Sequence, residues 1–374
     1  MARKRSKPKS ISRTADALRL ESRRRREQAQ KAADPRNRAL AEAERKAYRL
    51  EGELRSARAT ADSMKAELAH AEERIELLAG LSERQTSKPF HRQKRQRGPA
   101  GDATAVIVLS DWHVEESVEA AKVGGLNAFN LKIAAERIER TFQKSLMLLE
   151  DARHLADIRE VVVAVLGDLI SGYIHEELEE ANALAPLPAA RFAQEQLAAG
   201  LRLLLAEADV ERIVVPTCYG NHGRTTKRMR FATGDANSFE QNLYYVMAQQ
   251  FAGEPRIEWK IEPGLHNWVE VQGHQVRFHH GDSIKYQGGV GGITIPVNKA
   301  IAQWNRARKA NLDVFGHWHQ FCWNWSWVSN GCLIGYSPYA LRIKADFQPP
   351  TQTFMVIDRD NGLTRALPIY CTQK

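Results

Sequence analysis

The stretch TAVIVLSDWH, residues 104–113, decides the fold of this 374-residue chain. Its first six residues form a short, β-branched and apolar run, which predicts a buried strand. The strand leads directly into Asp111, Trp112 and His113. Alternate residues on an extended strand point to the same side, so the Asp111 carboxylate and the His113 imidazole are expected to face one way and Trp112 the other.

The same pattern, an apolar strand ending in a compact polar signal, recurs four more times. Helical patterns over residues 127–151 and 189–207 separate the first three strands, which predicts right-handed crossovers and a largely parallel α/β core. The carboxyl ends of such strands meet at one edge of a sheet, where ligands bind. The other four strands and the polar residues that follow them are 161–166 with Asp168, 212–219 with Asn221 and His222, 276–279 with His280, and 312–315 with His317 and His319.

These side chains have the chemistry of a metal site. Asp, Asn and His are oxygen and nitrogen ligands suited to Mn²⁺, Fe or Zn²⁺, and none of the five clusters contains cysteine. One ion could take Asp111, His113, Asp168 and one histidine of the last pair. A second could take Asp168, Asn221, His280 and the other histidine. Asp and Asn are also common in ordinary glycine-containing turns, but that reading leaves five ligand-bearing strand ends to coincidence.

The ordered motifs D-x-H, G-D, G-N-H, H-G and G-H-x-H, from Asp111 to His319, resemble the calcineurin-like metallophosphoesterase superfamily, which includes DNA-repair nucleases. Their wider context (SDWHVEE, GNHGRTT, RFHHGD, FGHWHQ) resembles metallophosphoesterases encoded by bacteriophages. The resemblance implies a four-layer α/β/β/α sandwich and a two-metal centre, with Mn²⁺ as the first choice. It also implies that His319 completes the first metal site and His317 the second. His280, and not the adjacent His279, is taken as a ligand because it directly precedes the glycine.

The resemblance further implies that His222 is a catalytic acid, although a structural histidine is the alternative. Many relatives carry an acidic residue after G-N-H, whereas Gly223 and Arg224 follow here. What sets the protonation of His222 is therefore open. Arg224 offers a two-pronged donor for phosphate. Lys227, Arg228 and Arg230 are either nucleic-acid contacts or a solvated basic run.

Positive charge is concentrated in the first hundred residues, which hold 27 Lys and Arg against 14 Asp and Glu, a net of +13. The remaining 274 residues hold 27 against 31, a net of −4. This asymmetry predicts a basic arm that meets nucleic acid, with a solvated tail as the equal alternative. No long apolar run or signal peptide is present, and the four cysteines lack CxxC spacing. We therefore expect a cytoplasmic protein (host cytoplasm if a phage encodes it) without a membrane partner.

A heptad pattern predicts a coiled coil that joins copies of the chain into a homo-oligomer. A long helix packed on its own catalytic domain is the alternative. The expected parts are a basic, disordered or transiently helical arm (1–38), the coiled coil (39–79), a basic linker (80–101) and the phosphoesterase domain (102–374). The apolar seam runs through Leu40, Ala43, Ala47, Leu50, Leu54, Ala57, Ala61, Met64, Leu68, Ala71, Ile75 and Leu78.

The C-terminal third is expected to contain hairpins turning at residues 272–273, 330–331 and 360–362. In the second of these, Phe321, Trp323, Trp325 and Trp327 alternate and are expected to share one strand face. That face is interpreted as packed core, with a base-stacking platform as the alternative.

Together these features predict a binuclear metal-dependent phosphodiesterase or nuclease acting on DNA. In that reading a hydroxide bridging the metals is the nucleophile and His222 the general acid. The alternatives are a phosphomonoesterase acting on nucleotides or phosphoproteins, and a non-catalytic DNA-binding scaffold. Whether a partner ATPase takes part is open.

Overall fold

A computed structural model describes residues 11–82, 101–285 and 292–372. The chain forms two compact units, Met1–Lys94 and Arg95–Lys374. None of the described helices combines the length and apolar character needed to cross a membrane. The predicted linker falls largely on residues 83–100, and these lie outside the described residues, as do residues 1–10 of the predicted arm.

The N-terminal unit is helical over α1 (Ile11–Ala33) and α2 (Pro35–Ser82). Residues 11–33 of the predicted arm are thus helical in the structure. Ala, Leu, Arg and Glu dominate the segment, and all are strong helix formers. The break comes at Asp34, whose carboxylate accepts the Arg36 amide, and Pro35 is favoured as the first residue of α2.

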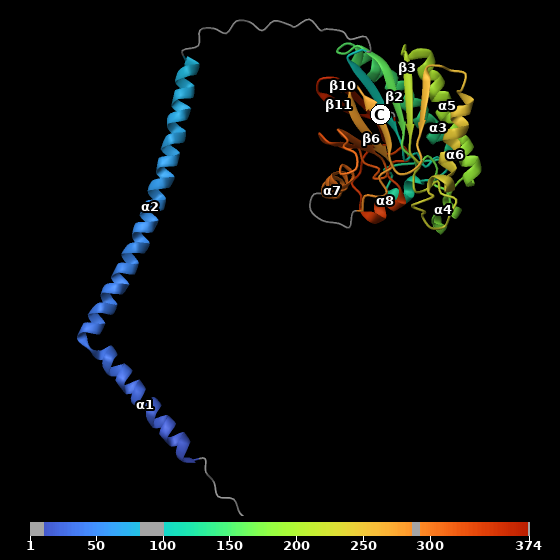
Figure 1. The fold of residues 1–374 in the computed structure, drawn as a ribbon. Coiled ribbons are helices and arrows are strands. Elements are labelled where there is room, and N and C mark those ends of the chain that lie inside the picture. The colour runs from blue at the N-terminus through green and yellow to red at the C-terminus, as the bar shows by residue number, and fades with distance from the viewer. Residues whose placement is uncertain (1–10, 83–100, 286–291, 373–374) are drawn as a thin grey trace, which may run out of the picture. The chain divides into compact units, whose positions relative to one another are not determined.

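The C-terminal unit is a mixed α/β structure with two sheets (Figure 1). The larger sheet has the order β11-β10-β1-β2-β3-β4. Strands β1 to β4 run parallel, and β10 and β11 are antiparallel additions. These strands are β1 (Ala103–Leu109), β2 (Ile158–Val165), β3 (Arg212–Thr217), β4 (Ile257–Ile261), β10 (Thr351–Asp358) and β11 (Gly362–Tyr370).

The smaller sheet has the order β5-β6-β7-β9-β8, in which β6, β7 and β9 are parallel. Its outer strands, β5 and β8, are antiparallel to their neighbours. The five strands are β5 (Asn267–Val271), β6 (His274–His279), β7 (Leu312–Phe315), β8 (Cys322–Trp323) and β9 (Trp327–Ser329). Both sheets thus have a parallel centre whose strand ends can carry a site.

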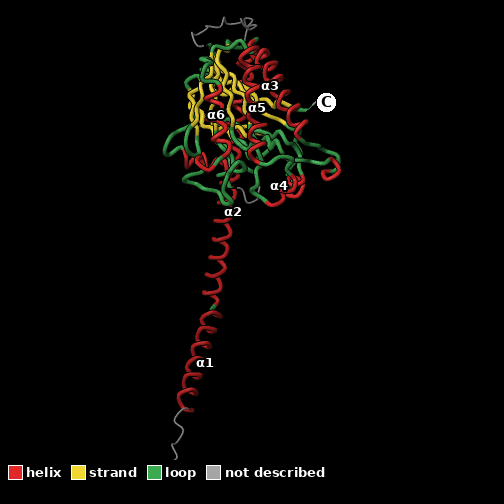
Figure 2. Tube along the Cα trace, turned by 90° about the vertical axis from the view of Figure 1, so that its right-hand side faces the viewer, coloured by secondary structure: helices red, strands yellow, loops and turns green. Residues whose placement is uncertain are grey.

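Helices α3, α5 and α6 pack on one face of the larger sheet, and Figure 2 shows them beside the strands. Helix α3 begins where Asn130 accepts the Ile133 amide, four residues after the expected start. The helices of this unit are η1 (Ala120–Val123), α3 (Leu131–Arg153), α4 (Glu176–Ala181), α5 (Pro186–Glu207), η2 (Asp235–Asn237), α6 (Phe239–Gln250), α7 (Thr294–Trp304) and α8 (Pro338–Ile343).

Three apolar clusters hold the unit together. The first joins the larger sheet to helices α3, α5 and α6. The second lies between the two sheets: Val106 and Val108 of β1 face it, whereas Ala105 and Ile107 face the helices. The third joins Val297 of α7 to Trp327 in the smaller sheet. Because β1 is buried on both faces, its sequence is continuously apolar and not alternating.

Two of the three expected hairpins are confirmed and one is wrong. Turns at Gln272 and at Asn361 join β5 to β6 and β10 to β11. The expected turn at residues 330–331 does not exist, because β8 and β9 pair around residues 324–326 and Asn330 already lies past β9. Within that turn, the Asn324 side chain accepts the Ser326 and Trp327 amides.

The expected shared face of the four aromatic residues is also wrong. The turn falls inside the run, so alternation does not continue through it. Trp327 is 1% exposed in the third cluster, and Phe321 packs partly against the second. Trp323 and Trp325 are 43% and 83% exposed. Core packing therefore accounts for two of the four aromatic side chains.

Candidate metal centre

Every predicted metal ligand lies just past the end of a strand. Asp111 and His113 follow β1, Asp168 follows β2, and Asn221 follows β3. His280 directly follows β6. His317 and His319 follow β7. The side chains of Asp111, His113, Asp168 and His280 are at most 1% exposed, so they lie inside the protein where ligand groups must be paired.

One group of potential ligands consists of Asp111, His113 and His319, whose ligand atoms all lie within 4.8 Å of one another. His113 Nε2 is 3.2 Å from His319 Nε2, and His319 Nε2 is 3.4 Å from Asp111 Oδ1. Two ring nitrogens and a carboxylate oxygen that face one point form a suitable cation site once the rings are neutral.

The second group consists of Asp168, His280 and His317, again within 4.8 Å. His280 Nε2 is 3.0 Å from Asp168 Oδ2 and 3.1 Å from Asn221 Oδ1, so the Asn221 side chain joins this group. The structure thus brings all seven predicted ligands into two clusters, with His319 in the first and His317 in the second. That Asp168 bridges two ions stays a prediction.

Five of these seven residues have a left-handed backbone conformation. The φ angles are 54° for Asp111, 48° for His113, 50° for Asp168, 67° for His317 and 57° for His319. The Asp111 and His113 side chains do face one point, as expected, but left-handed residues and not an extended chain bring them there. Two left-handed residues flank Trp112, whose buried indole donates to Gln352. Such conformations cost roughly 1–3 kcal/mol each and cluster at functional sites.

Surrounding groups fix the orientation of the ligand side chains. His113 Nδ1 is 2.9 Å from Ser171 Oγ, and His280 Nδ1 donates to the Leu166 carbonyl at 2.8 Å. In both rings Nε2 is therefore the nitrogen that faces the cluster. Asp111 accepts the His317 amide at 3.0 Å. Partners of this kind set the tautomer and the aim of a metal-binding histidine.

The charges in the second group compensate one another. Burial alone would lower the pKa of His280, but the Asp168 carboxylate raises it to about 10. Against the effect of burial, the His280 and His222 rings hold the pKa of Asp168 well below its usual range. Burial and the His280 charge lower the pKa of His317 to about 4. A cation entering this group displaces the His280 proton, so binding should weaken as the pH falls.

Two glycines allow the ligand-bearing loops to approach each other closely. A Cβ on Gly220 would lie 2.0 Å from Asp168 Oδ1, and a Cβ on Gly316 would lie 2.3 Å from Asp111 Oδ2. Neither has a positive φ, so the requirement comes from space and not from backbone conformation. The glycines of G-N-H and G-H-x-H therefore make room for the carboxylates.

His222 lies beside the first group of ligands. Its ring is 4.8 Å from the His113 ring, centroid to centroid, and its Nδ1 is 3.0 Å from the Ser171 carbonyl. Its amide donates to Asp168 Oδ1 at 2.7 Å. The Ser171 carbonyl is thus the partner of the His222 ring in place of a carboxylate. Buried Glu115 accepts the Ser171 amide and holds that segment in position.

Glu240 of helix α6 is a residue that the sequence did not reveal. Its carboxylate is fully buried and accepts the Leu169 amide at 2.6 Å and the Gly220 amide at 2.7 Å. It thereby joins the loop after β2 to the loop after β3. A Cβ on Gly223 would lie 2.8 Å from its Cγ, so the residue after G-N-H makes room for this side chain. Burial and the Asp168 charge raise the pKa of Glu240 to about 7.

Arg224 is folded into its own turn. Its guanidinium donates to the carbonyls of Asn221 at 2.6 Å, Thr226 at 3.0 Å and Lys227 at 3.3 Å. In this conformation it fixes the backbone that carries Asn221, and its contact with phosphate stays a prediction. Lys227, Arg228 and Arg230 are exposed on the same loop.

Comparison with known proteins leaves the family undetermined. No family model matches the chain, and no curated protein matches it. Among solved structures, a Vps29 variant from Entamoeba histolytica is 14% identical over 71% of this chain and 98% of that one, with a TM-score of 0.29. A dimetal phosphatase from Danio rerio is 10% identical over 72% and 100%, with a TM-score of 0.35. The phosphopantetheinyl hydrolase of Mycobacterium tuberculosis is 12% identical over 66% and 94%, with a TM-score of 0.26. Likenesses this distant do not establish a function.

Proposed function

We propose that the chain is a phosphoester hydrolase that works with two divalent metal ions in an α/β/β/α metallophosphoesterase sandwich. The observation that carries this proposal is the pair of ligand clusters, in which five residues keep a left-handed backbone at strand ends. Ordinary turn residues would not give two convergent sets of nitrogen and oxygen atoms, and left-handed conformations recur at five of the seven residues that supply them.

The donor set fits two borderline cations. Asp111, His113 and His319 would hold one ion, and Asp168, Asn221, His280 and His317 the other. Carboxylate, amide and imidazole ligands suit Mn²⁺ first, with Fe and Zn²⁺ as alternatives. Two such ions, when bound, supply Lewis acidity that activates water and offsets charge on phosphate oxygens.

His222 is proposed to donate a proton to the leaving oxygen. When the ring is protonated, Nδ1 donates to the Ser171 carbonyl, and the proton on Nε2 is the one that a leaving oxygen could accept. The amide of His222 is tied to Asp168, so the acid and the metal ligand keep a fixed spacing. Proton donation of this kind contributes typically about 10²–10⁴-fold to a rate. Arg224 is proposed to stabilise phosphate charge once its own turn opens.

The favoured substrate is a phosphodiester of nucleic acid, DNA first. Support comes from the net charge of +13 on residues 1–100, because phosphate backbones bind such segments strongly. Exposed Lys227, Arg228 and Arg230 add cations beside the site. Removal of residues 1–100 should lower activity on long DNA and leave activity on a small diester unchanged. If removal of residues 1–100 changes neither activity, the phosphomonoesterase is favoured, because in that alternative the arm serves assembly alone.

The heptad seam on α2 is proposed to bind a second copy of the chain. Its large apolar side chains from Leu40 to Ile75 are between 52% and 65% exposed within the described unit. A narrow seam of this period matches a coiled-coil partner. Light scattering on the purified chain should give an oligomer, and Leu50→Glu with Leu54→Glu should give a monomer. A monomeric wild type would end this part of the proposal.

The first test compares bis-p-nitrophenyl phosphate with p-nitrophenyl phosphate, using metal-stripped protein supplied with Mn²⁺. We expect turnover of the diester, abolished in Asp168→Ala and reduced in His222→Ala. Preference for the monoester would replace the nuclease by a phosphatase. DNA binding without any turnover, retained in Asp168→Ala, would favour a scaffold.

A further inference from the structure

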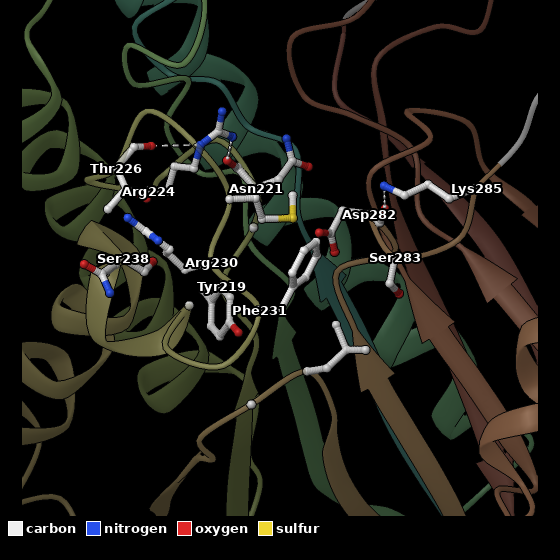
Figure 3. Close-up of a pocket in the computed structure, with 16 residues that line it drawn as sticks. Tyr219, Asn221, Arg224, Thr226, Arg230, Phe231, Ser238, Asp282, Ser283 and Lys285 are labelled. Atoms are coloured by element: carbon white, nitrogen blue, oxygen red, sulfur yellow. Dashed lines mark hydrogen bonds between the residues drawn. The ribbon is translucent and has the colours of Figure 1, made fainter.

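A cavity of about 250 Å³ opens beside the second group of metal ligands (Figure 3). Its wall includes Asn221 of that group and Asp282, two residues past His280. The rest comes from the loop between β3 and α6, from residues 264–265 between β4 and β5, and from Ser283 and Lys285. A ligand held here therefore has the metal centre at one end.

The cavity has a mostly apolar wall with aromatic rings. Tyr219, Met229, Phe231 and Leu265 all contribute to it, and Figure 3 shows the Tyr219 and Phe231 rings on its surface. Phe231 is 88% exposed, which is unusual for a large aromatic side chain. The volume is below the ~300–1,000 Å³ of sites for drug-sized ligands, so it suits a single ring system.

The polar groups at the cavity set the kind of ring. Asp282 places an acceptor in the wall. Carboxylates accept hydrogen bonds from exocyclic amino groups of bases. Arg230 and Lys285 also contribute to the wall and are exposed. The guanidinium of Arg230 has no hydrogen-bond or ion-pair partner among the residues that the structure describes, so it remains available to a phosphate.

We propose that this cavity is a nucleobase subsite, which receives the base of the nucleotide whose phosphate lies at the metal centre. The assignment rests on the proposed phosphoesterase function and gives it a substrate class, an amino-bearing nucleotide. Phe231 and Leu265 contact the base, and Arg230 meets a flanking phosphate.

The test is a calorimetric titration of the full chain in Mn²⁺ with deoxycytidine 5′-monophosphate and with 2-deoxyribose 5-phosphate, which lacks only the base. Base stacking on an aromatic ring contributes about 1–3 kcal/mol, or about 5- to 150-fold in affinity. We expect the nucleotide to bind at least about fivefold more tightly. Phe231→Ala and Leu265→Ala should each reduce that ratio toward one. Tyr245→Ala, which removes a half-exposed ring on α6 outside the cavity, should leave it unchanged.

Turnover of methyl p-nitrophenyl phosphate separates the two proposals, because this diester carries no base. It should be present in the wild type and remain within about twofold of that level in Tyr245→Ala. Equal binding of the two ligands by the wild type, or an unchanged ratio in both cavity variants, overturns the subsite even where turnover is normal. A clear base preference in a wild type that hydrolyses no diester supports the subsite and overturns the hydrolase.

Discussion

Gly220→Ala should disable the second group of metal ligands, although it adds only one methyl group and Gly220 is not itself a ligand. The φ of Gly220 is not in the left-handed region, so alanine meets no backbone penalty there. What it meets is Asp168: the added Cβ would lie 2.0 Å from Oδ1 and 2.4 Å from the amide nitrogen. The effect of the substitution is therefore steric.

The size of the effect follows from these distances. Real Cβ atoms essentially never approach closer than 3.0 Å, so the Asp168 carboxylate must retreat by about 1 Å. Metal–ligand distances tolerate about 0.2 Å. We therefore expect a loss in Mn²⁺ affinity of at least about 10- to 100-fold. Oδ1 also accepts the His222 amide at 2.7 Å. Overpacking plus loss of this hydrogen bond should lower the free energy of unfolding by about 2–5 kcal/mol.

Calorimetric titration with Mn²⁺ measures the loss of affinity. Urea unfolding in the presence of a chelator measures the loss of stability. Gly253→Ala is the matched control, because its Cβ meets nothing within 4 Å. Stability and affinity should change little in the control. A Gly220→Ala protein that binds Mn²⁺ at both groups with wild-type affinity would refute the reasoning, since Asp168 would then not be a ligand or the loops would not be in contact.

Three further predictions use other parts of the domain. Gly316→Ala should remove Mn²⁺ binding at the first group, because its Cβ would lie 2.3 Å from Asp111 Oδ2; calorimetry showing two intact sites would contradict this. Saturating Mn²⁺ at about 100 times Kd should raise the unfolding free energy of the wild type by about 2.7 kcal/mol, and an equal gain in Asp168→Asn would argue against the assigned ligand. Burial, with the nearby charges of His279 and Arg277, lowers the pKa of His266 to about 3. As the pH drops, the His266 side chain is therefore protonated in the unfolded chain before it is protonated in the folded one. The free energy of unfolding consequently falls between pH 6.5 and about pH 3. His266→Phe should make that fall shallower by about 2 kcal/mol in urea unfolding at pH 4, after allowance for partial exposure; an unchanged slope would contradict it.

The sequence predicted the strands that carry the site because each is buried on both faces. Continuous apolar runs such as residues 104–109 and 161–166 have no other simple placement. A parallel sheet brings their carboxyl ends to one edge, so ligands far apart in the chain could be grouped before any coordinates were known. The prediction of a hairpin turn at residues 330–331 was wrong. It relied on the local turn preference of Asn-Gly, whereas the actual turn is stabilised by the Asn324 side chain, which accepts two backbone amides.

Residues whose role depends on contacts between distant segments have no recognisable pattern in the sequence. Glu240 lies in an ordinary amphipathic helix, and its role depends on Gly223 being small and on two amides from different loops. Arg224 has the chemistry of a phosphate ligand, yet its guanidinium is engaged by three carbonyls of its own turn. In both cases residue type indicates what a side chain can bind, and only the fold determines what it meets first.

The left-handed ligands show why the motifs contain both strain and glycine. A strand that continued past Leu109 would carry Asp111 along the sheet, away from the loops that follow β2 and β7. A left-handed residue turns the chain within one position, and Asp111, Asp168 and His317 each do so. The turned loops then come so close that glycine alone fits at Gly220 and Gly316. The surrounding contacts are expected to keep residue 111 left-handed when its carboxylate is removed. Asp111→Gly, which removes both the ligand and its backbone penalty, should therefore abolish metal binding while costing less stability than Asp111→Ala, by about 1 kcal/mol. Urea unfolding of the two variants measures the difference, and equal stabilities would show that the left-handed conformation at Asp111 is not strained.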